Sequence, residues 1–346
     1  MDADESGTVV VNFFVMINSD LSLVSNVFSG EPLEVAATRD GFGSGVVEAG
    51  KHDSRVVVLC ADLAESTRAD WFKNELPERY VEIGVAEQNL ATVASGMAAM
   101  GKIPFITSYA AFNPGRNNEQ IRTTIALNNQ PVKICGMHAG ISVGPDGATH
   151  QALEDIGLMR MLPNMTVVVP SDAEEARKAT VAVAFSNKPA YLRFGREKTP
   201  VITTAETPFE IGRLLTLWHP GDVEVAVFAC GALVYPSLLA AKELFDAEGI
   251  RAAVYNNHSI KPMDIDGVIR AAREAGAVVT AEEHQITGGM GTTVAEILVQ
   301  NHPVPMELIG VHDRFGQSGE PTQLMEHYGM SVGSIKNAIR KVRARK

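Results

Sequence analysis

The hydrophobic residues of this chain fall into short runs separated by longer stretches of mixed polarity, beginning near Glu34. Runs such as residues 56–59 are apolar throughout, which is typical of strands that are covered on both faces of a parallel sheet. Helices are expected between the runs, including residues 119–127 and 173–184. The strands predicted in this first half are residues 55–60, 80–83, 103–106, 132–137, 166–169 and 190–194.

The alternation of strands and helices is interrupted between residues 196 and 212, a stretch rich in Thr and Pro, and resumes after it. Strands are then predicted at 223–229, 252–256, 277–282 and 306–310, and helices at 233–248, 264–275, 292–301 and 332–343. Strands that alternate with helices form βαβ units. We therefore predict an α/β fold of two consecutive α/β domains with mainly parallel sheets: residues 34–196, a linker at 197–212, and residues 213–346.

Residues 1–33 precede this pattern, and we predict an N-terminal extension that is either disordered or packed on a partner. Its apolar run, residues 9–17, is interrupted by Asn12 and is far shorter than the roughly 20 residues of a membrane-spanning helix. The acidic residues Asp2, Asp4 and Glu5 have the wrong charge for a signal peptide. No membrane association is therefore expected.

The composition is that of an ordinary globular enzyme, with 45% hydrophobic and 21% charged residues in 346. The 30 basic and 41 acidic residues give a net charge of −11, which argues against a nucleic-acid partner because such proteins need a basic face. Cys60, Cys135 and Cys230 lie in or at the end of apolar runs without metal-ligand spacing. We expect them to be buried free thiols, as in a reducing cytoplasm.

An acidic residue, Glu87, stands where a predicted strand gives way to a helix of small residues, 90–100. Ligands of α/β proteins bind at such junctions, at the carboxyl ends of parallel strands. Burial there would disfavour the charged form of a carboxylate and suit it to proton transfer. The alternative is a solvated residue stabilised by the helix dipole, and this segment alone does not separate the two.

Three segments of the chain resemble transketolases, a family of thiamine diphosphate enzymes. They are residues 62–66 (DLAES), 84–89 (GVAEQN) and 144–151 (GPDGATHQ). Three motifs in one order are more specific than any one of them. The resemblance covers roughly residues 35–340 and corresponds to the second half of a full-length transketolase. It implies a pyrimidine-binding domain followed by a transketolase C-terminal domain.

The resemblance also implies that thiamine diphosphate is the cofactor and that Glu87 activates its aminopyrimidine ring. Phe112 matches the aromatic residue that stacks on this ring, Tyr109 matches a neighbour that lines the same pocket, and Asp62 is a further cofactor-binding residue. Without the resemblance, the two aromatic residues would be assigned to the core. Residues 113–116 depart from the family pattern by an apparent one-residue insertion, so the contacts just beyond Phe112 stay open.

A sugar phosphate is the substrate that the resemblance implies. His150 is expected near the reacting hydroxyls, where it can shuttle protons, and it is the second candidate catalytic residue. His138 matches a position nearer the phosphate, and Asp146 one that meets a sugar hydroxyl. An arginine fork can bond two phosphate oxygens at once, although a lone arginine is more often a surface charge. The residues matched to phosphate contacts are Arg39, Ser66 and Arg196.

The chain lacks a usable Gly-Asp-Gly segment, which in this family supplies ligands for the metal that holds the cofactor's diphosphate. Its closest string, residues 144–147, belongs to the sugar-side segment. We therefore predict no metal ligand in this chain. The resemblance implies that an amino-terminal transketolase subunit holds the diphosphate and Mg²⁺, and that two such pairs form a heterotetramer with shared active sites.

These observations predict the carboxy-terminal subunit of a split transketolase, which transfers a two-carbon ketol unit from a ketose phosphate to an aldose phosphate, by default in pentose-phosphate metabolism. A 2-oxoacid dehydrogenase beta subunit would use the same glutamate, but Asp146, Thr149 and His150 favour a sugar substrate. A deoxyxylulose-phosphate synthase normally carries both halves in one chain. A non-catalytic scaffold partner that has kept the fold is the alternative from a different class.

Overall fold

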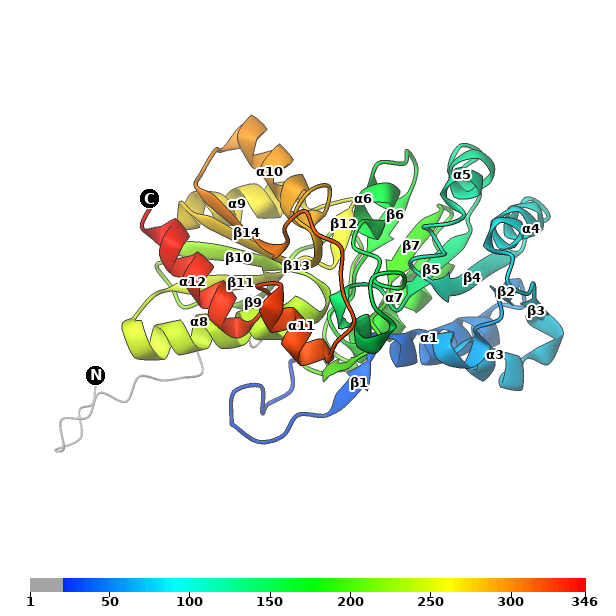
Figure 1. Cartoon of the computed structure of the whole chain (residues 1–346), viewed down its shortest axis with the longest axis horizontal. Helices are drawn as coiled ribbons and strands as arrows, with labels where there is room; N and C mark the ends of the chain where they lie inside the picture. Colours follow the sequence, from blue (N-terminus) through cyan, green and yellow to red (C-terminus); the bar gives the residue numbers. More distant parts are fainter. Residues whose placement is uncertain (1–20) are drawn as a thin grey trace.

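The computed structural model describes residues 21–346, which form two α/β units (Figure 1). The first unit contains a seven-stranded sheet with the order β12-β6-β7-β5-β4-β2-β3, in which every neighbouring pair except β12–β6 is parallel. Its strands are β2 (Val56–Cys60), β3 (Tyr80–Glu82), β4 (Ile103–Tyr109), β5 (Lys133–Met137), β6 (Thr166–Val168), β7 (Ala190–Arg193) and β12 (Ser259–Lys261).

The second unit contains a five-stranded sheet with the order β14-β13-β10-β11-β9, in which only β9 is antiparallel to its neighbour. The predicted fold class, two consecutive α/β domains with mainly parallel sheets, is confirmed. The strands of this sheet are β9 (Leu215–Trp218), β10 (Val225–Ala229), β11 (Ala252–Asn256), β13 (Val278–Gln285) and β14 (Met306–Val311).

Helices cover both faces of the first sheet, which explains why a central strand such as β2 is apolar throughout. In β2, Val57 and Leu59 pack with Leu90 on one side of the sheet, whereas Val58 packs with Phe42 on the other. The helices α1 (Thr38–His52), α3 (Ala69–Glu75) and α7 (Ala173–Ala184) lie on the Phe42 side, and α4 (Glu87–Ala99) and α6 (Asp155–Arg160) on the Leu90 side. Shorter pieces are α2 (Ala64–Thr67), α5 (Asn118–Gln120) and a π-helical turn, Ile121–Ala126.

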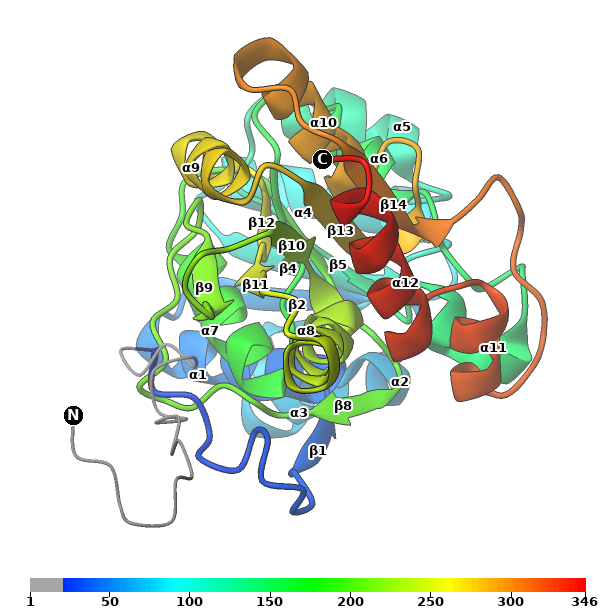
Figure 2. The same ribbon diagram turned by 90° about the vertical axis from the view of Figure 1, so that its left-hand side faces the viewer.

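The second sheet is also covered on both faces (Figure 2). Helices α8 (Val234–Glu248) and α12 (Val332–Arg343) share one hydrophobic cluster with it. Helices α9 (Ile265–Ala275) and α10 (Met290–Asn301) pack in a second cluster, which continues into the first unit through α6. The short helix α11 (Pro321–His327) follows β14. The two units therefore share part of their core.

Several short strands that join distant parts of the chain had no signal in the sequence. Strand β12 follows β11 of the second sheet but pairs with β6 of the first. Strand β8 (Lys198–Pro200), within the segment expected to be a linker, pairs antiparallel with β1 (Val35–Ala37). Strand β9 adds to the second sheet next to β11.

Residues 21–33 pack on this chain, which differs from the expectation of disorder or of packing on a partner. Leu21 and Val27 are buried in the cluster that holds α8 and α12. The ring of Phe28 meets that of Trp218 edge-on, with 5.4 Å between the centroids. These apolar side chains order the segment because they are buried against the second unit. Residues 1–20, the rest of the predicted extension, lie outside the described residues.

The three cysteines, Cys60, Cys135 and Cys230, are buried and free, as predicted. Across residues 21–346, none of the helices has both the length and the apolar character needed to cross a membrane.

Candidate functional site

Most residues predicted for the site follow the carboxyl ends of neighbouring parallel strands. Strand β3 precedes Glu87, β4 ends at Tyr109, β5 is followed directly by His138, and β7 precedes Arg196. Since these strands are parallel members of one sheet, their carboxyl ends lie along the same edge. This edge is where open α/β sheets hold their ligands.

Glu87 is the first residue of α4, and its side chain is only 2% exposed, so it is not a solvated helix-start residue. Its Oε2 accepts a hydrogen bond from Nη1 of Arg116 at 2.7 Å. Its backbone carbonyl accepts one from Nδ2 of Asn117 at 3.0 Å, and the same amide donates to Oδ1 of Asn113. The start of α4 is therefore tied to the segment that follows β4.

Four predicted residues form an aromatic cluster after β4 and β5. The rings of Tyr109 and Phe112 are stacked with 6.2 Å between their centroids, and His138 stacks on Tyr109 at 4.1 Å. His150 lies edge-on to Phe112 at 5.4 Å and to Tyr109 at 6.0 Å. The guanidinium of Arg116 lies 4.5 Å from the centre of the Phe112 ring, so it links this cluster to Glu87.

Arg39, near the start of α1, holds His138 in one protonation state. Its Nη1 donates to the carbonyl of Ser66 at 2.9 Å and to Nε2 of His138 at 2.8 Å. Because arginine can only donate, Nε2 accepts and the ring proton is on Nδ1. The Ser66 carbonyl, 3.2 Å from the same Nε2, therefore receives its hydrogen bond from Arg39. Burial and then the charge of Arg39 lower the pKa of His138 to about 3, so the ring is neutral at physiological pH.

Positive charge accumulates around this histidine. Burial and the neighbouring charge of Arg68 lower the pKa of Arg39, and Arg196 acts on it in the same direction. Nη1 of Arg196 donates to the carbonyl of Val143 at 2.8 Å and lies 3.5 Å from Oδ1 of Asp146. Clustered arginines of this kind are suited to an anionic ligand, which would relieve their repulsion.

The buried side chain of Gln151 holds the loop that carries Asp146 and His150. Nε2 of this buried residue donates to the carbonyl of Ile141 at 3.0 Å and to that of Gln317, in the second unit, at 3.0 Å. Nδ1 of His150 lies 2.9 Å from the Thr149 hydroxyl. The second unit therefore supports the loop that carries Asp146 and His150.

One predicted residue stands apart from these contacts. Asp62 is exposed, has a left-handed backbone with φ of 58°, and donates its N–H to Oε1 of Glu82 at 2.8 Å. This hydrogen bond ties Asp62 to the end of β3 and not to the other predicted side chains.

Two residues of the site were not predicted from the sequence. Arg116 lies four residues after Phe112, a spacing that brings side chains together on one helical turn and could have indicated their contact. Arg68, whose Nε donates to Oδ1 of Asp40 at 2.6 Å, has no local signal in the sequence because it reaches Arg39 only through the fold.

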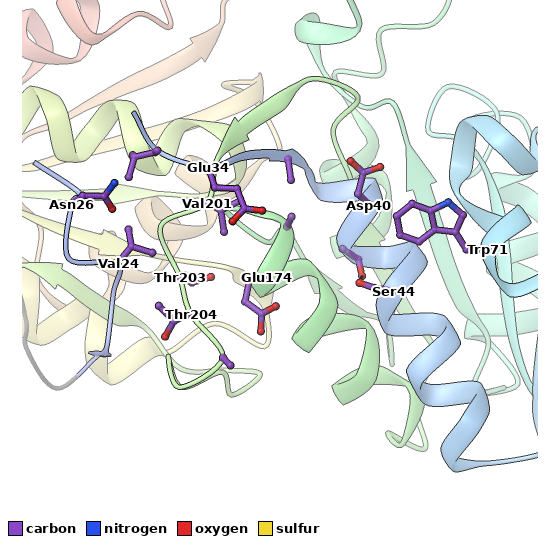
Figure 3. Close-up of a pocket in the computed structure, with 15 residues that line it drawn as sticks. Val24, Asn26, Glu34, Asp40, Ser44, Trp71, Glu174, Val201, Thr203 and Thr204 are labelled. Atoms are coloured by element: carbon purple, nitrogen blue, oxygen red, sulfur yellow. Dashed lines mark hydrogen bonds between the residues drawn. The ribbon is translucent and has the colours of Figure 1, made fainter. Parts of the chain in front are cut away.

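Two cavities border this part of the chain. One of about 670 Å³ lies beside α1 and α7, and its lining includes the carboxylates of Glu34, Asp40 and Glu174 (Figure 3). Another, of about 580 Å³, lies between the two units and is lined in part by Arg193 and Glu283. Neither lining contains a residue predicted to bind cofactor or substrate. In residues 21–346, no three His, Cys, Asp or Glu side chains are grouped so as to hold a metal ion.

Known proteins match the chain over most of its length. Residues 34–201 match the transketolase pyrimidine-binding domain and residues 218–335 the transketolase C-terminal domain. The chain is 38% identical to the 6-deoxy-6-sulfo-D-fructose transketolase subunit of Clostridium sp. (strain MSTE9), over 91% of this chain and 97% of that protein. It is 35% identical to an apulose-4-phosphate transketolase subunit of Phocaeicola vulgatus, over 86% and 95%. A solved structure, described as a split gene transketolase in an inactive beta4 tetramer, has a TM-score of 0.83 and 42% identity over 89% of this chain and 98% of its own.

This chain therefore belongs to the transketolase family, whose enzymes use thiamine diphosphate. Within the family it is a subunit of the split-gene type, because the relatives that it matches over nearly their whole length are separate transketolase subunits.

Proposed function

We propose that this chain supplies half of the active site of a thiamine diphosphate-dependent transketolase. The complete enzyme transfers a two-carbon ketol unit from a ketose phosphate to an aldose phosphate. The observation that carries this proposal is the buried carboxylate of Glu87, joined through Arg116 to the face of the Phe112 ring. A buried acid next to an aromatic face is what binding and protonating a heteroaromatic ring requires.

The residues present fit the aminopyrimidine ring of the cofactor. The position of the Arg116 guanidinium supports this fit, because this planar group with N–H donors lies over Phe112 and bonds to Glu87 at the same time. In the proposed enzyme, Phe112 and Tyr109 hold the ring face, Glu87 holds a proton at its carboxyl oxygen, and Asp62 contributes from the end of β2. Bound there, thiamine diphosphate would supply the carbon nucleophile that accepts the ketol unit.

The cationic residues next to the aromatic cluster fit the substrate. Arg39 and Arg196 would bind the phosphate, with the Ser66 segment and the neutral His138 beside them. His150, edge-on to Phe112, would move a proton at a reacting hydroxyl, and Asp146 would accept a hydrogen bond from another hydroxyl. The name of one relative includes a sulfonated sugar and that of the other a sugar phosphate. Ketoses that carry either a sulfonate or a phosphate group are therefore worth testing as ketol donors.

We also propose that an amino-terminal transketolase subunit holds the diphosphate and Mg²⁺ and that the active assembly is a heterotetramer. Val85, two positions before Glu87 in the chain, is 71% exposed, and Leu127, after the π-helical turn, is 73% exposed. Exposed apolar side chains around a half-site favour an interface there. The solved relative described as an inactive beta4 tetramer agrees with a chain that needs its partner. The three buried free thiols favour the cytoplasm.

The test is to mix this chain with its amino-terminal partner, thiamine diphosphate and Mg²⁺, and to measure ketol transfer from phosphorylated and sulfonated ketoses. The proposal expects transfer in the mixture only, and a loss of about 10²–10⁴-fold in Glu87→Gln. The exposed His52, changed to Gln, is the control. Full activity in Glu87→Gln would support the scaffold alternative, and turnover of 2-oxoacids without turnover of ketoses would support the dehydrogenase alternative.

A further inference from the structure

The guanidinium of Arg116 makes both of the contacts that the proposed site reserves for the aminopyrimidine ring. It donates to Oε2 of Glu87 at 2.7 Å and lies 4.5 Å from the centre of the Phe112 ring. Its side chain is nevertheless 48% exposed, whereas that of Glu87 is 2% exposed. The carboxylate is thus fixed in the core, while its partner can leave towards solvent.

The backbone aims Arg116 at this position. The N–H of Arg116 donates to the carbonyl of Phe112 at 3.1 Å, which puts the two side chains one turn apart on the same face. A Cβ on Gly115 would lie 2.2 Å from the carbonyl oxygen of Ala111, so only glycine permits this turn. The next residue, Asn117, is anchored to the Glu87 carbonyl. The contact therefore follows from the turn and not from a freely chosen side-chain conformation.

We propose that Arg116 is a placeholder for the cofactor. Without thiamine diphosphate it neutralises the buried Glu87 carboxylate and covers the face of Phe112, and it swings towards solvent when the aminopyrimidine ring enters. This inference rests on the proposed function, because it takes Glu87 and Phe112 as cofactor residues. Its consequence is that only the molecules whose Arg116 has left Glu87 can bind the cofactor. The apparent Kd then equals the intrinsic Kd divided by the fraction of such molecules.

The experiment measures thiamine diphosphate binding by calorimetry, with Mg²⁺, in the reconstituted complex containing wild type, Arg116→Met or Arg122→Met. Arg122 is an exposed arginine on the following π-helical turn, so its replacement matches the change in charge. A cation–π contact and a half-exposed ion pair are each modest, so we expect the Kd of Arg116→Met to fall about tenfold and that of Arg122→Met to stay within about twofold. A Kd that rises in Arg116→Met would make Arg116 a cofactor ligand, and an unchanged Kd would show that it does not compete; each result overturns the proposal.

A second measurement needs no cofactor. In the chain alone, Arg116→Met should lower the melting temperature more than Arg122→Met does, because the buried Glu87 loses its partner. In a Glu87→Gln background this difference should disappear, and its persistence would show that the two side chains are not coupled. If neither wild type nor Arg116→Met binds thiamine diphosphate in the complex, the proposed function itself fails. If wild type binds it and the Arg116→Met affinity does not increase, only the placeholder fails.

Discussion

Protonation of His138 is predicted to destabilise the fold. The ring accepts a hydrogen bond from Arg39 and lies near Arg196 and Arg68, and its pKa is lowered from 6.5 to about 3 by burial and then by these charges. Because the pKa is lower in the folded chain, the unfolded chain binds a proton at pH values where the folded chain does not. The stability that depends on neutral His138 is therefore complete above the unfolded pKa of 6.5 and is lost as the pH falls below it. A shift of one pKa unit corresponds to about 1.4 kcal/mol. The free energy of unfolding should therefore be about 3 kcal/mol lower at about pH 4.5, and the loss approaches about 5 kcal/mol below about pH 3.

The assay is urea denaturation of wild type, His138→Gln and His52→Gln at about pH 7.5 and 4.5. Glutamine can still accept a hydrogen bond from Arg39 but does not titrate. From about pH 7.5 to about pH 4.5, the drop in the free energy of unfolding should therefore be about 3 kcal/mol smaller in His138→Gln than in wild type. His52, which is exposed, should behave as wild type does. Equal pH dependence in wild type and His138→Gln, or an NMR titration of His138 near pH 6.5, would refute this reasoning.

Three other substitutions test separate parts of the structure. Glu175→Gln removes the carboxylate that lies 3.0 Å from Nδ1 of the buried His258. The free energy of unfolding, measured by chemical denaturation, should therefore fall by about 3–5 kcal/mol. A loss under about 1 kcal/mol would contradict a stabilising pair between the units. Arg196→Gln should raise KM for a phosphorylated donor about 10–100-fold with a smaller change in kcat; an equal loss with an unphosphorylated donor would argue against a phosphate contact. Phe112→Leu should raise the Kd for thiamine diphosphate about tenfold in calorimetry, and an unchanged Kd would exclude stacking on this ring.

The sequence predicted most strands of both sheets because the central ones are buried on two faces and apolar without interruption, as in β2 and β10. Strand β12 could not be predicted in the same way. It has only three residues, Ser259–Lys261, and its partner β6 lies about ninety positions earlier. Because β12 follows a strand of the second sheet but joins the first, its pairing depends on the packing of the two units. The docking of residues 21–33 on the second unit is also a long-range contact, and a local pattern carries no information about it.

The site was predicted as a set of residues and not as a set of contacts. The family resemblance, first indicated by three short motifs, implied which side chains to expect, and the parallel sheet places most of them along one edge. The motifs did not indicate that Arg116 joins Glu87 to Phe112, because that contact depends on the turn at Gly115, where the chain departs from the family pattern. They also did not indicate the tautomer of His138, which is set by Arg39 from a distant helix.

The central claim is that the active site is shared between this chain and a second subunit. The most direct measurement is calorimetric binding of thiamine diphosphate with Mg²⁺ to this chain alone and to its mixture with the amino-terminal partner. We predict binding in the mixture and none to the isolated chain, because this chain is proposed to hold the aminopyrimidine ring but not the diphosphate. Tight binding to the isolated chain would contradict the account, since it would require a complete diphosphate site within these 346 residues.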